Sequence, residues 1–263
     1  LAHGVSSRCE NRKKFMSIRV LVNGALGKMG RLACQTLEDS PDFDLVGQLG
    51  RADDLSSSIA HTKAQVVIDL TRADVAYDNA LTIIKNQASP VIGTSGLTLA
   101  QIKHLTTLCE AADLGGIVVP NFSIGAVLMM HCAAIASRYL ANVEIIETHH
   151  PQKFDAPSGT ALKTAEQIAK YQTTPSLLPH SKESIPGVRG GLYKDIPIHS
   201  LRLPGVIAKQ DVILGHLGET LTISHNTTDR KAFMAGMILC CQKVRTIRTL
   251  VNGLEHFLSL PTC

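Results

Sequence analysis

A dense group of titratable side chains lies in the middle of the chain, just after an apolar run that ends at Ile146. The apolar run predicts a buried strand, and Pro151 ends its regular pairing because proline has no N–H to donate. Imidazole, ammonium and carboxylate groups follow closely, on Glu147, His149, His150, Lys153 and Asp155. Groups that exchange protons near neutral pH suit acid–base catalysis. The alternative is a solvated polar turn with surface histidines.

A turn of small polar residues follows this group and opens a predicted helix: Ser158, Gly159 and Thr160. Free backbone N–H groups and hydroxyls at a helix N-terminus favour a bound carboxylate. Lys153 can donate a proton or bind a carboxylate beside the imidazoles. In a regular strand His149 and His150 point to opposite faces, so one can face a ligand while the other contacts a different part of it. We therefore expect a proton-donating and anion-binding half-site here.

A glycine turn near the start of the chain predicts a second half-site. It lies between a predicted strand at residues 18–22 and a helical pattern, and it consists of Gly24, Ala25, Leu26, Gly27, Lys28, Met29 and Gly30. In a strand–turn–helix unit such a turn can hold the pyrophosphate of a dinucleotide through backbone N–H groups. A P-loop is excluded because Met29 follows the lysine in place of serine or threonine. A tight turn without a ligand is the alternative.

The end of the second predicted strand bears on the choice of nucleotide. A dinucleotide site often carries an acidic residue about 20 positions after the glycine turn, where it binds the ribose 2′-hydroxyl. Here that place holds Gly50 and Arg51. A guanidinium can bind a 2′-phosphate through two hydrogen bonds, which favours NADPH and leaves NADH open. Alternatively, Arg51 is a solvated surface charge.

Strands alternate with helices from residue 18 to about residue 119, which predicts an α/β fold with a Rossmann-like, doubly wound parallel sheet. Ligands bind such sheets at the carboxyl ends of the strands. Further strand-end residues should therefore line one crevice with the glycine turn: Thr71, Gly93, Thr94, Ser95, Asn121 and Phe122.

The alternation stops after about residue 140. Strand-like segments separated by glycine turns follow at 196–203, 210–216 and 219–225, and they predict an open antiparallel sheet. A long helix capped at Asp229 and an amphipathic helix at 250–258 should return to the first sheet.

These patterns divide the chain into two domains. We assign residues 16–119 and 229–263 to a dinucleotide-binding domain, and residues 120–228 to an α+β domain for substrate binding and oligomerisation. Residues 1–15 precede the core pattern, and we expect them to be a leader outside the fold.

Composition excludes several classes of protein. The chain of 263 residues is 44% hydrophobic and 18% charged, which is typical of a globular protein. Most of the net charge of +4 lies in residues 1–15 and aromatic residues make up only 4%, so no nucleic-acid partner is expected. No apolar run reaches the ~20 residues of a membrane span. Seven cysteines without a C-x-x-C pair fit free thiols in the cytoplasm.

Metal-dependent hydrolysis and a serine nucleophile are further alternatives. Zinc needs three or four ligands, and the histidines form no H-x-x-x-H or H-x-E frame. Ser158 lies outside any G-x-S-x-G elbow. We expect no metal.

The central segment resembles the signature of the dihydrodipicolinate reductase (4-hydroxy-tetrahydrodipicolinate reductase) family of the lysine and diaminopimelate pathway. The matching pattern is Glu147-x-His149-His150-x-x-Lys153-x-Asp155-Ala156-Pro157-Ser158-Gly159-Thr160-Ala161. The glycine turn joins it in the same order, as do Gly93-Thr94-Ser95-Gly96 and Asn121-Phe122-Ser123. The resemblance covers about residues 18–260.

The resemblance implies a Rossmann-like cofactor domain built from both ends of the chain and a substrate domain that forms a homotetramer. It implies that His149 is the proton donor/acceptor and Lys153 a second proton donor. His150, Gly159 and Thr160 would bind the carboxylates of a cyclic dicarboxylate. NADH or NADPH would contact the glycine turn, residues 93–95, and Val119, Pro120, Asn121 and Phe122. The expected reaction is the reduction of 4-hydroxy-tetrahydrodipicolinate to tetrahydrodipicolinate.

Two departures and two rival functions accompany the resemblance. The family's usual acidic residue at the second strand end is Gly50 here, and the region 51–65 is shorter than in longer members. One rival is another Rossmann-type dehydrogenase of a small amino-acid-related substrate. The other is a nucleotide-sensing protein without activity, which would not need His149 and Lys153 together.

Replacing Arg51 tests the 2′-phosphate interpretation. Arg51→Ala should weaken NADPH binding more than NADH binding, because only NADPH offers the phosphate. Titration of the variant with each nucleotide measures this difference. Equal losses for the two nucleotides would contradict the interpretation.

Overall fold

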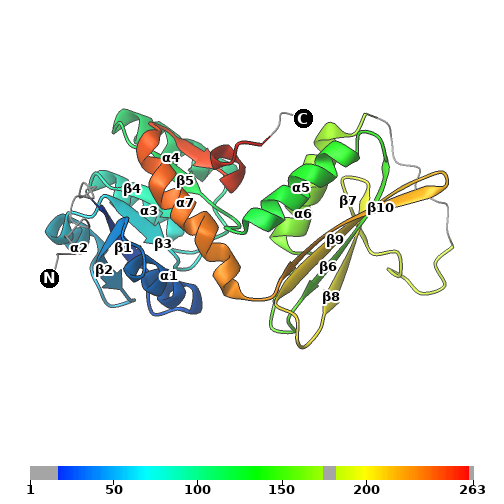
Figure 1. Ribbon diagram of the computed structural model, residues 1–263, viewed down its shortest axis with the longest axis horizontal. Helices are drawn as coiled ribbons and strands as arrows, with labels where there is room; N and C mark the ends of the chain where they lie inside the picture. Colours follow the sequence, from blue (N-terminus) through cyan, green and yellow to red (C-terminus); the bar gives the residue numbers. More distant parts are fainter. Residues whose placement is uncertain (1–16, 174–181, 261–263) are drawn as a thin grey trace, which may run out of the picture.

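Two sheets form the framework of the molecule (Figure 1). The computed structural model describes residues 17–173 and 182–260, so the expected leader at residues 1–15 lies outside the described residues. The first sheet has six strands in the order β11-β5-β4-β3-β1-β2, and every neighbouring pair is parallel. This confirms the predicted Rossmann-like sheet.

Short buried strands alternate with helices along the first half of the chain, as the apolar periodicity predicts. The strands are β1 (Ile18–Asn23), β2 (Phe43–Leu49), β3 (Val66–Asp69), β4 (Ser89–Ile92) and β5 (Gly116–Val118). The helices between them are α1 (Lys28–Glu38), α2 (Leu55–Thr62), α3 (Ala76–Lys85) and α4 (Leu99–Ala111). The stretch after Arg51 thus keeps a short helix, α2, whose first turn is capped by Asp54.

Both faces of this sheet are covered, because successive side chains of a strand point to opposite sides. In β1, Val20 and Val22 pack with α1 and the C-terminal helix α7 (Met234–Lys243). Leu21 faces the other way, into a core formed with α2, α3 and α4. Parallel strands buried on both faces place their carboxyl ends, and the glycine turn after β1, along one edge.

The C-terminal segment returns to the first sheet, but in a form that differs from the prediction. The prediction of a helix at 250–258 is wrong. Instead, β11 (Leu250–Asn252) pairs with β5, and a short 3-10 turn, η3 (Leu254–Phe257), follows it. Gly253 has a φ of +116°, outside the helical region, and β5 offers an unpaired edge. The side chain of Asp229 caps a 3-10 turn, η1 (Arg230–Phe233), and α7 follows this turn directly.

The second sheet has five strands in the order β10-β9-β6-β8-β7. Its strands are β6 (Asn142–His149), β7 (Gly191–Tyr193), β8 (Ile196–Arg202), β9 (Ala208–His216) and β10 (Glu219–Thr227). The predicted antiparallel pairing is found between β9 and β10, but the sheet is mixed, because β6 pairs with β8 in parallel. The long connection between these strands contains the helix α6 (Gly159–Tyr171), and such a crossover permits parallel pairing.

One face of the second sheet is covered by α6 and by α5 (Ile124–Ala136), which pack on each other. Val143 and Ile145 of β6 point toward these helices and are buried with Ala165 and Ile168 of α6. In Figure 1 the two helices lie between the first sheet and the second. The end of β6 nevertheless lies near the first sheet, because His149 lines a cavity together with Gly93, which follows β4.

Substitution of Gly30 tests the close packing of the glycine turn. A Cβ at Gly30 would lie 2.1 Å from the backbone oxygen of Gly24, whereas a Cβ at Gly27 would lie 3.4 Å from the same oxygen. Gly30→Ala should therefore cost at least about 1–3 kcal/mol of unfolding free energy through overpacking, and Gly27→Ala much less. Urea unfolding of both variants measures this, and equal stability losses would contradict the packing argument.

Candidate active site

Side chains of β6 alternate between its two faces, and the face that is apolar at the start of the strand ends in polar residues of the site. Val143, Ile145, Glu147 and His149 are two residues apart and point to the same side of the sheet. The first two are buried against α6, so Glu147 is drawn into the protein beneath the start of that helix. The strand ends at His149. Burial of a carboxylate here requires partners.

Those partners come from three elements. Arg202 at the end of β8 donates from its two terminal nitrogens to both carboxylate oxygens of Glu147, each at 3.0 Å. The backbone N–H of Ser158 donates to Oε1 at 3.2 Å, and Nδ1 of His149 lies 2.5 Å from Oε2. Burial alone would raise the pKa of Glu147, but hydrogen bonds from His149, Arg202 and Ser200 outweigh it and lower the pKa to about 2. Glu147 is therefore a buried carboxylate anion.

This carboxylate sets the direction of the His149 ring. A proton on Nδ1 that is donated to Glu147 leaves Nε2 as the nitrogen that faces away from the pair. The side chain of His149 is 16% exposed, and the residue lines the cavity between the two sheets. An imidazole beside a fixed anion is well suited to take up and release a proton at Nε2.

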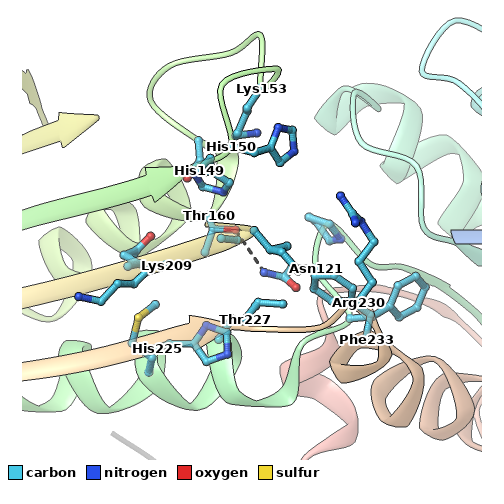
Figure 2. A pocket seen from close by; sticks show the side chains of 18 of the residues that line it. Asn121, His149, His150, Lys153, Thr160, Lys209, His225, Thr227, Arg230 and Phe233 are labelled. Carbon is cyan, nitrogen blue, oxygen red and sulfur yellow. Dashed lines mark hydrogen bonds between the residues drawn. The ribbon is translucent and has the colours of Figure 1, made fainter. Parts of the chain in front are cut away.

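The cavity joins the two predicted half-sites. From the first half it is lined by Met29, Gly93, Pro120, Asn121 and Phe122. From the second half it is lined by His149, His150, Lys153, Ser158 and Thr160. Figure 2 shows the labelled side chains of both groups around one space, with Asn121 bonded to Thr160. The Nδ2 of Asn121 donates to Oγ1 of Thr160 at 3.2 Å, which ties the two halves together.

The turn before α6 has the geometry of an anion site. Ser158 is the N-cap, and its hydroxyl accepts from the N–H of Ala161 at 3.1 Å. A Cβ added at Gly159 would meet no atom within 4 Å, so the backbone there borders open space. Free N–H groups of a first helical turn attract a carboxylate.

His150 and Lys153 lie on the loop that follows β6. His149 and His150 would point to opposite faces in a regular strand, but β6 ends at His149, and both histidines line the same cavity, as Lys153 does. The Nδ1 of His150 is buried and has no hydrogen-bond partner within the described chain. The ammonium of Lys153 donates to both carboxylate oxygens of Asp155, at 2.8 and 2.9 Å. Burial opposes ionisation of Asp155, but these bonds lower its pKa.

The glycine turn approaches the neighbouring backbone closely. Gly24 has a φ of +84°, and a Cβ there would lie 2.7 Å from the backbone oxygen of Leu70. Helix α1 starts at Lys28 without any side-chain cap, since its N-cap is Gly27. Its first N–H groups and positive dipole end therefore face outward without a capping side chain, as a phosphate-binding turn requires.

The other residues predicted to bind the nucleotide lie at or near the same strand ends. Thr71 follows β3, and its N–H donates to Asp69, a fully buried aspartate whose pKa is raised by burial. Thr94 and Val119 are buried behind the crevice, and Ser95 lines an adjoining cavity with His149. Arg51 is exposed beyond β2 and lies outside the cavity that His149 lines.

Sequence reasoning did not find several residues of the site. Arg202 meets Glu147 because the register of β6 and β8 places it beside His149. The cavity is also lined by Lys209, His225, Thr227 and Arg230 (Figure 2). Burial lowers the pKa of His225, whose Nε2 lies 3.1 Å from the hydroxyl of Ser123. The sequence signal for these residues was only their place at or beside the boundaries of predicted strands and of the helix capped at Asp229.

Comparison with known proteins places the chain in a family. The family profile "Dihydrodipicolinate reductase, N-terminus" matches residues 18–122, and "Dihydrodipicolinate reductase, C-terminus" matches residues 125–258. A protein of Legionella pneumophila (strain Paris) named 4-hydroxy-tetrahydrodipicolinate reductase is 59% identical over 92% of this chain and 100% of its own length. One of the same name from Coxiella burnetii (strain Dugway 5J108-111) is 48% identical over the same shares.

A solved structure has the same fold and a closely related sequence. The dipicolinate-bound dihydrodipicolinate reductase from Paenisporosarcina sp. TG-14 is 41% identical, with a TM-score of 0.84, over 92% of this chain and 100% of that chain. An amine dehydrogenase from Mycobacterium smegmatis, at 12% identity and a TM-score of 0.61 over 90% and 95% of the two chains, shares the fold alone. The match over both halves, with the site assembled as described, shows that the chain belongs to the dihydrodipicolinate reductase family.

Proposed function

We propose that this chain reduces 4-hydroxy-tetrahydrodipicolinate to tetrahydrodipicolinate, with a hydride from a nicotinamide cofactor and a proton from the His149 site. The observation that carries the proposal is the shared cavity, in which His149, Lys153 and Thr160 face Met29 and Phe122. Members of the family with this name are 48–59% identical to the chain. The product belongs to lysine and diaminopimelate biosynthesis, which operates in the cytoplasm.

The residues of the first half fit a dinucleotide. The backbone of the glycine turn has no room for a Cβ at Gly24 or Gly30, and the start of α1 has no side-chain cap. These features suit a pyrophosphate, with Gly93–Ser95 and Val119–Phe122 toward the nicotinamide end. The bound cofactor supplies the hydride. The protein binds and orients both reactants and handles the proton.

The second half fits a small cyclic dicarboxylate. The N–H groups at Gly159 and Thr160 would bind one carboxylate, at the start of α6. His150 has a buried Nδ1 without a partner in the described chain, and the ammonium of Lys153 lies nearby on the same cavity wall. These cationic or N–H-rich groups favour a dianion over a neutral ring.

His149 is proposed as the proton donor, and Glu147 as the residue that holds its ring. The adjacent carboxylate lies 2.5 Å from Nδ1 and so orients the imidazole. Arg202 and Ser158 fix that carboxylate in turn, so Nε2 points steadily at the cavity. Lys153 is proposed as a second proton donor, and its side chain is positioned by a hydrogen bond to Asp155.

We also propose a homotetramer built on the open face of the second sheet. The face opposite α5 and α6 carries Ile146 and Ile213, which are half-buried, and Leu192 and Leu201, which are exposed. Apolar side chains gathered on an open sheet are typical of a subunit contact.

No helix within residues 17–173 and 182–260 is long and apolar enough to cross a membrane.

Replacing the proton donor tests the proposed function. His149→Ala should lower kcat by roughly 10²–10⁴-fold, as loss of a general acid does, with little change in cofactor affinity. The loss of absorbance of the reduced cofactor, with substrate generated in situ, measures turnover. His61→Ala, an exposed histidine on α2, is the matched control and should keep full activity. Wild-type turnover in His149→Ala would remove His149 from the mechanism, and cofactor binding without any turnover would support the sensor.

The pKa of Glu147 predicts a specific dependence of stability on pH. The folded-state pKa of about 2 lies below the ordinary value of 4.5, so the stability that ionised Glu147 contributes is complete above pH 4.5. It is lost as the pH falls from 4.5 toward 2. Urea unfolding at a series of pH values should show a smaller decline over this window for Glu147→Gln, which cannot titrate. Parallel declines in the two proteins would contradict the buried-anion assignment.

A further inference from the structure

A carboxylate lies at the second strand end although the sequence has glycine there. The side chain of Asp53 folds back toward β2, and its Oδ2 accepts a hydrogen bond from the backbone N–H of Gly50 at 2.7 Å. The chain thus makes a tight turn after Leu49, with the acidic group returned to the place where the strand ends. Asp53 follows Gly50 by three residues in the sequence, and this turn brings its carboxylate back beside Gly50.

The geometry places this carboxylate close to where a side chain of residue 50 would be. A Cβ added at Gly50 would lie 3.7 Å from Oδ2 of Asp53 and 2.8 Å from Cδ1 of Leu26. Leu26 belongs to the glycine turn, and the N–H groups of Gly24 and Ala25 donate to the oxygen of Leu49 at 3.0 and 2.9 Å. The Asp53 carboxylate therefore borders the glycine turn on the side of β2.

Asp54, the next residue, holds the turn through its own carboxylate and not through that of Asp53. Asp54 is the N-cap of α2, and its Oδ1 accepts from the N–H of Ser57 at 2.7 Å. Asp53 is exposed and is held only through Oδ2 among the hydrogen bonds of the described residues. One oxygen, Oδ1, is left to accept a hydrogen bond from a ligand on this edge of the sheet.

A carboxylate beside the glycine turn at the second strand end can accept hydrogen bonds from ribose hydroxyls, and it repels a 2′-phosphate. We propose that Asp53 accepts the 2′-hydroxyl of the adenosine ribose and selects NADH over NADPH. The inference rests on the proposed use of a nicotinamide cofactor and names the residue that decides its type. Arg51, exposed in the same turn, acts in the opposite sense by attracting a 2′-phosphate.

The test compares the dissociation constants of NADH and NADPH for the whole wild-type protein and for two variants. Asp53→Asn keeps an oxygen that can accept from Gly50 but removes the charge. It should weaken NADH binding by roughly 10-fold and strengthen NADPH binding, because a charged acceptor is lost and a repulsion is relieved. Asp54→Asn is the matched control, since it removes the same charge one residue away and asparagine is also a good N-cap.

The outcomes separate this inference from the proposed function. A shift of preference from NADH toward NADPH in Asp53→Asn, with a wild-type preference in Asp54→Asn, supports a direct contact with the ribose, whereas a shift toward NADH overturns it. An unchanged ratio in Asp53→Asn, or an equal change in both variants, overturns the role of Asp53 while wild-type turnover still stands. Failure of the wild-type protein to bind either nucleotide overturns the inference and the proposed function together.

Discussion

The buried carboxylate of Glu147 is the interaction on which the site depends. It lies on the same buried face of β6 as the apolar residues before it, where an unpaired anion would cost several kcal/mol of folding free energy. Its stability therefore requires Arg202 from β8, the N–H of Ser158 at the start of α6, and Nδ1 of His149. One group thus fixes the register of two parallel strands, the position of a helix N-terminus and the direction of an imidazole. The same carboxylate therefore holds both the imidazole of His149 and the start of α6 beside the cavity.

The first half of the site follows from a different constraint, the close approach of backbone segments. Gly24 and Gly30 allow the turn to sit against β3 and α1 at distances that a Cβ would forbid. The bond from Asn121 to Thr160 then joins this half to the second across the cavity. Hydride transfer needs the two reactants held within contact distance of each other, so a direct link between the halves bears on catalysis as well as on folding. The division into the two domains stays a prediction.

Local patterns were sufficient for much of this account. The strand–turn–helix unit at Gly24–Gly30 and the cluster at His149 are encoded by neighbouring residues. The strand-end residues of the first sheet were expected to line one crevice with the glycine turn, because parallel strand ends meet at one edge. Long-range pairing was not readable in the same way. The helix expected at 250–258 is overridden by the free edge of β5, and the β6–β8 register that brings Arg202 to Glu147 joins residues 55 positions apart. Asp53 was missed because a turn, and not its sequence position, places it at the strand end.

The central claim is that a hydride crosses this cavity from the nicotinamide to the ring while the protein supplies the proton. Isotope tracing tests it most directly. The reaction is run in ordinary water with a reduced cofactor that carries deuterium at the transferred position of nicotinamide C4, and the product is analysed by mass spectrometry. Hydride transfer from the cofactor places one deuterium on a ring carbon of each product molecule. Product formed without deuterium would show that the hydrogen came from solvent and would contradict hydride transfer from the nicotinamide.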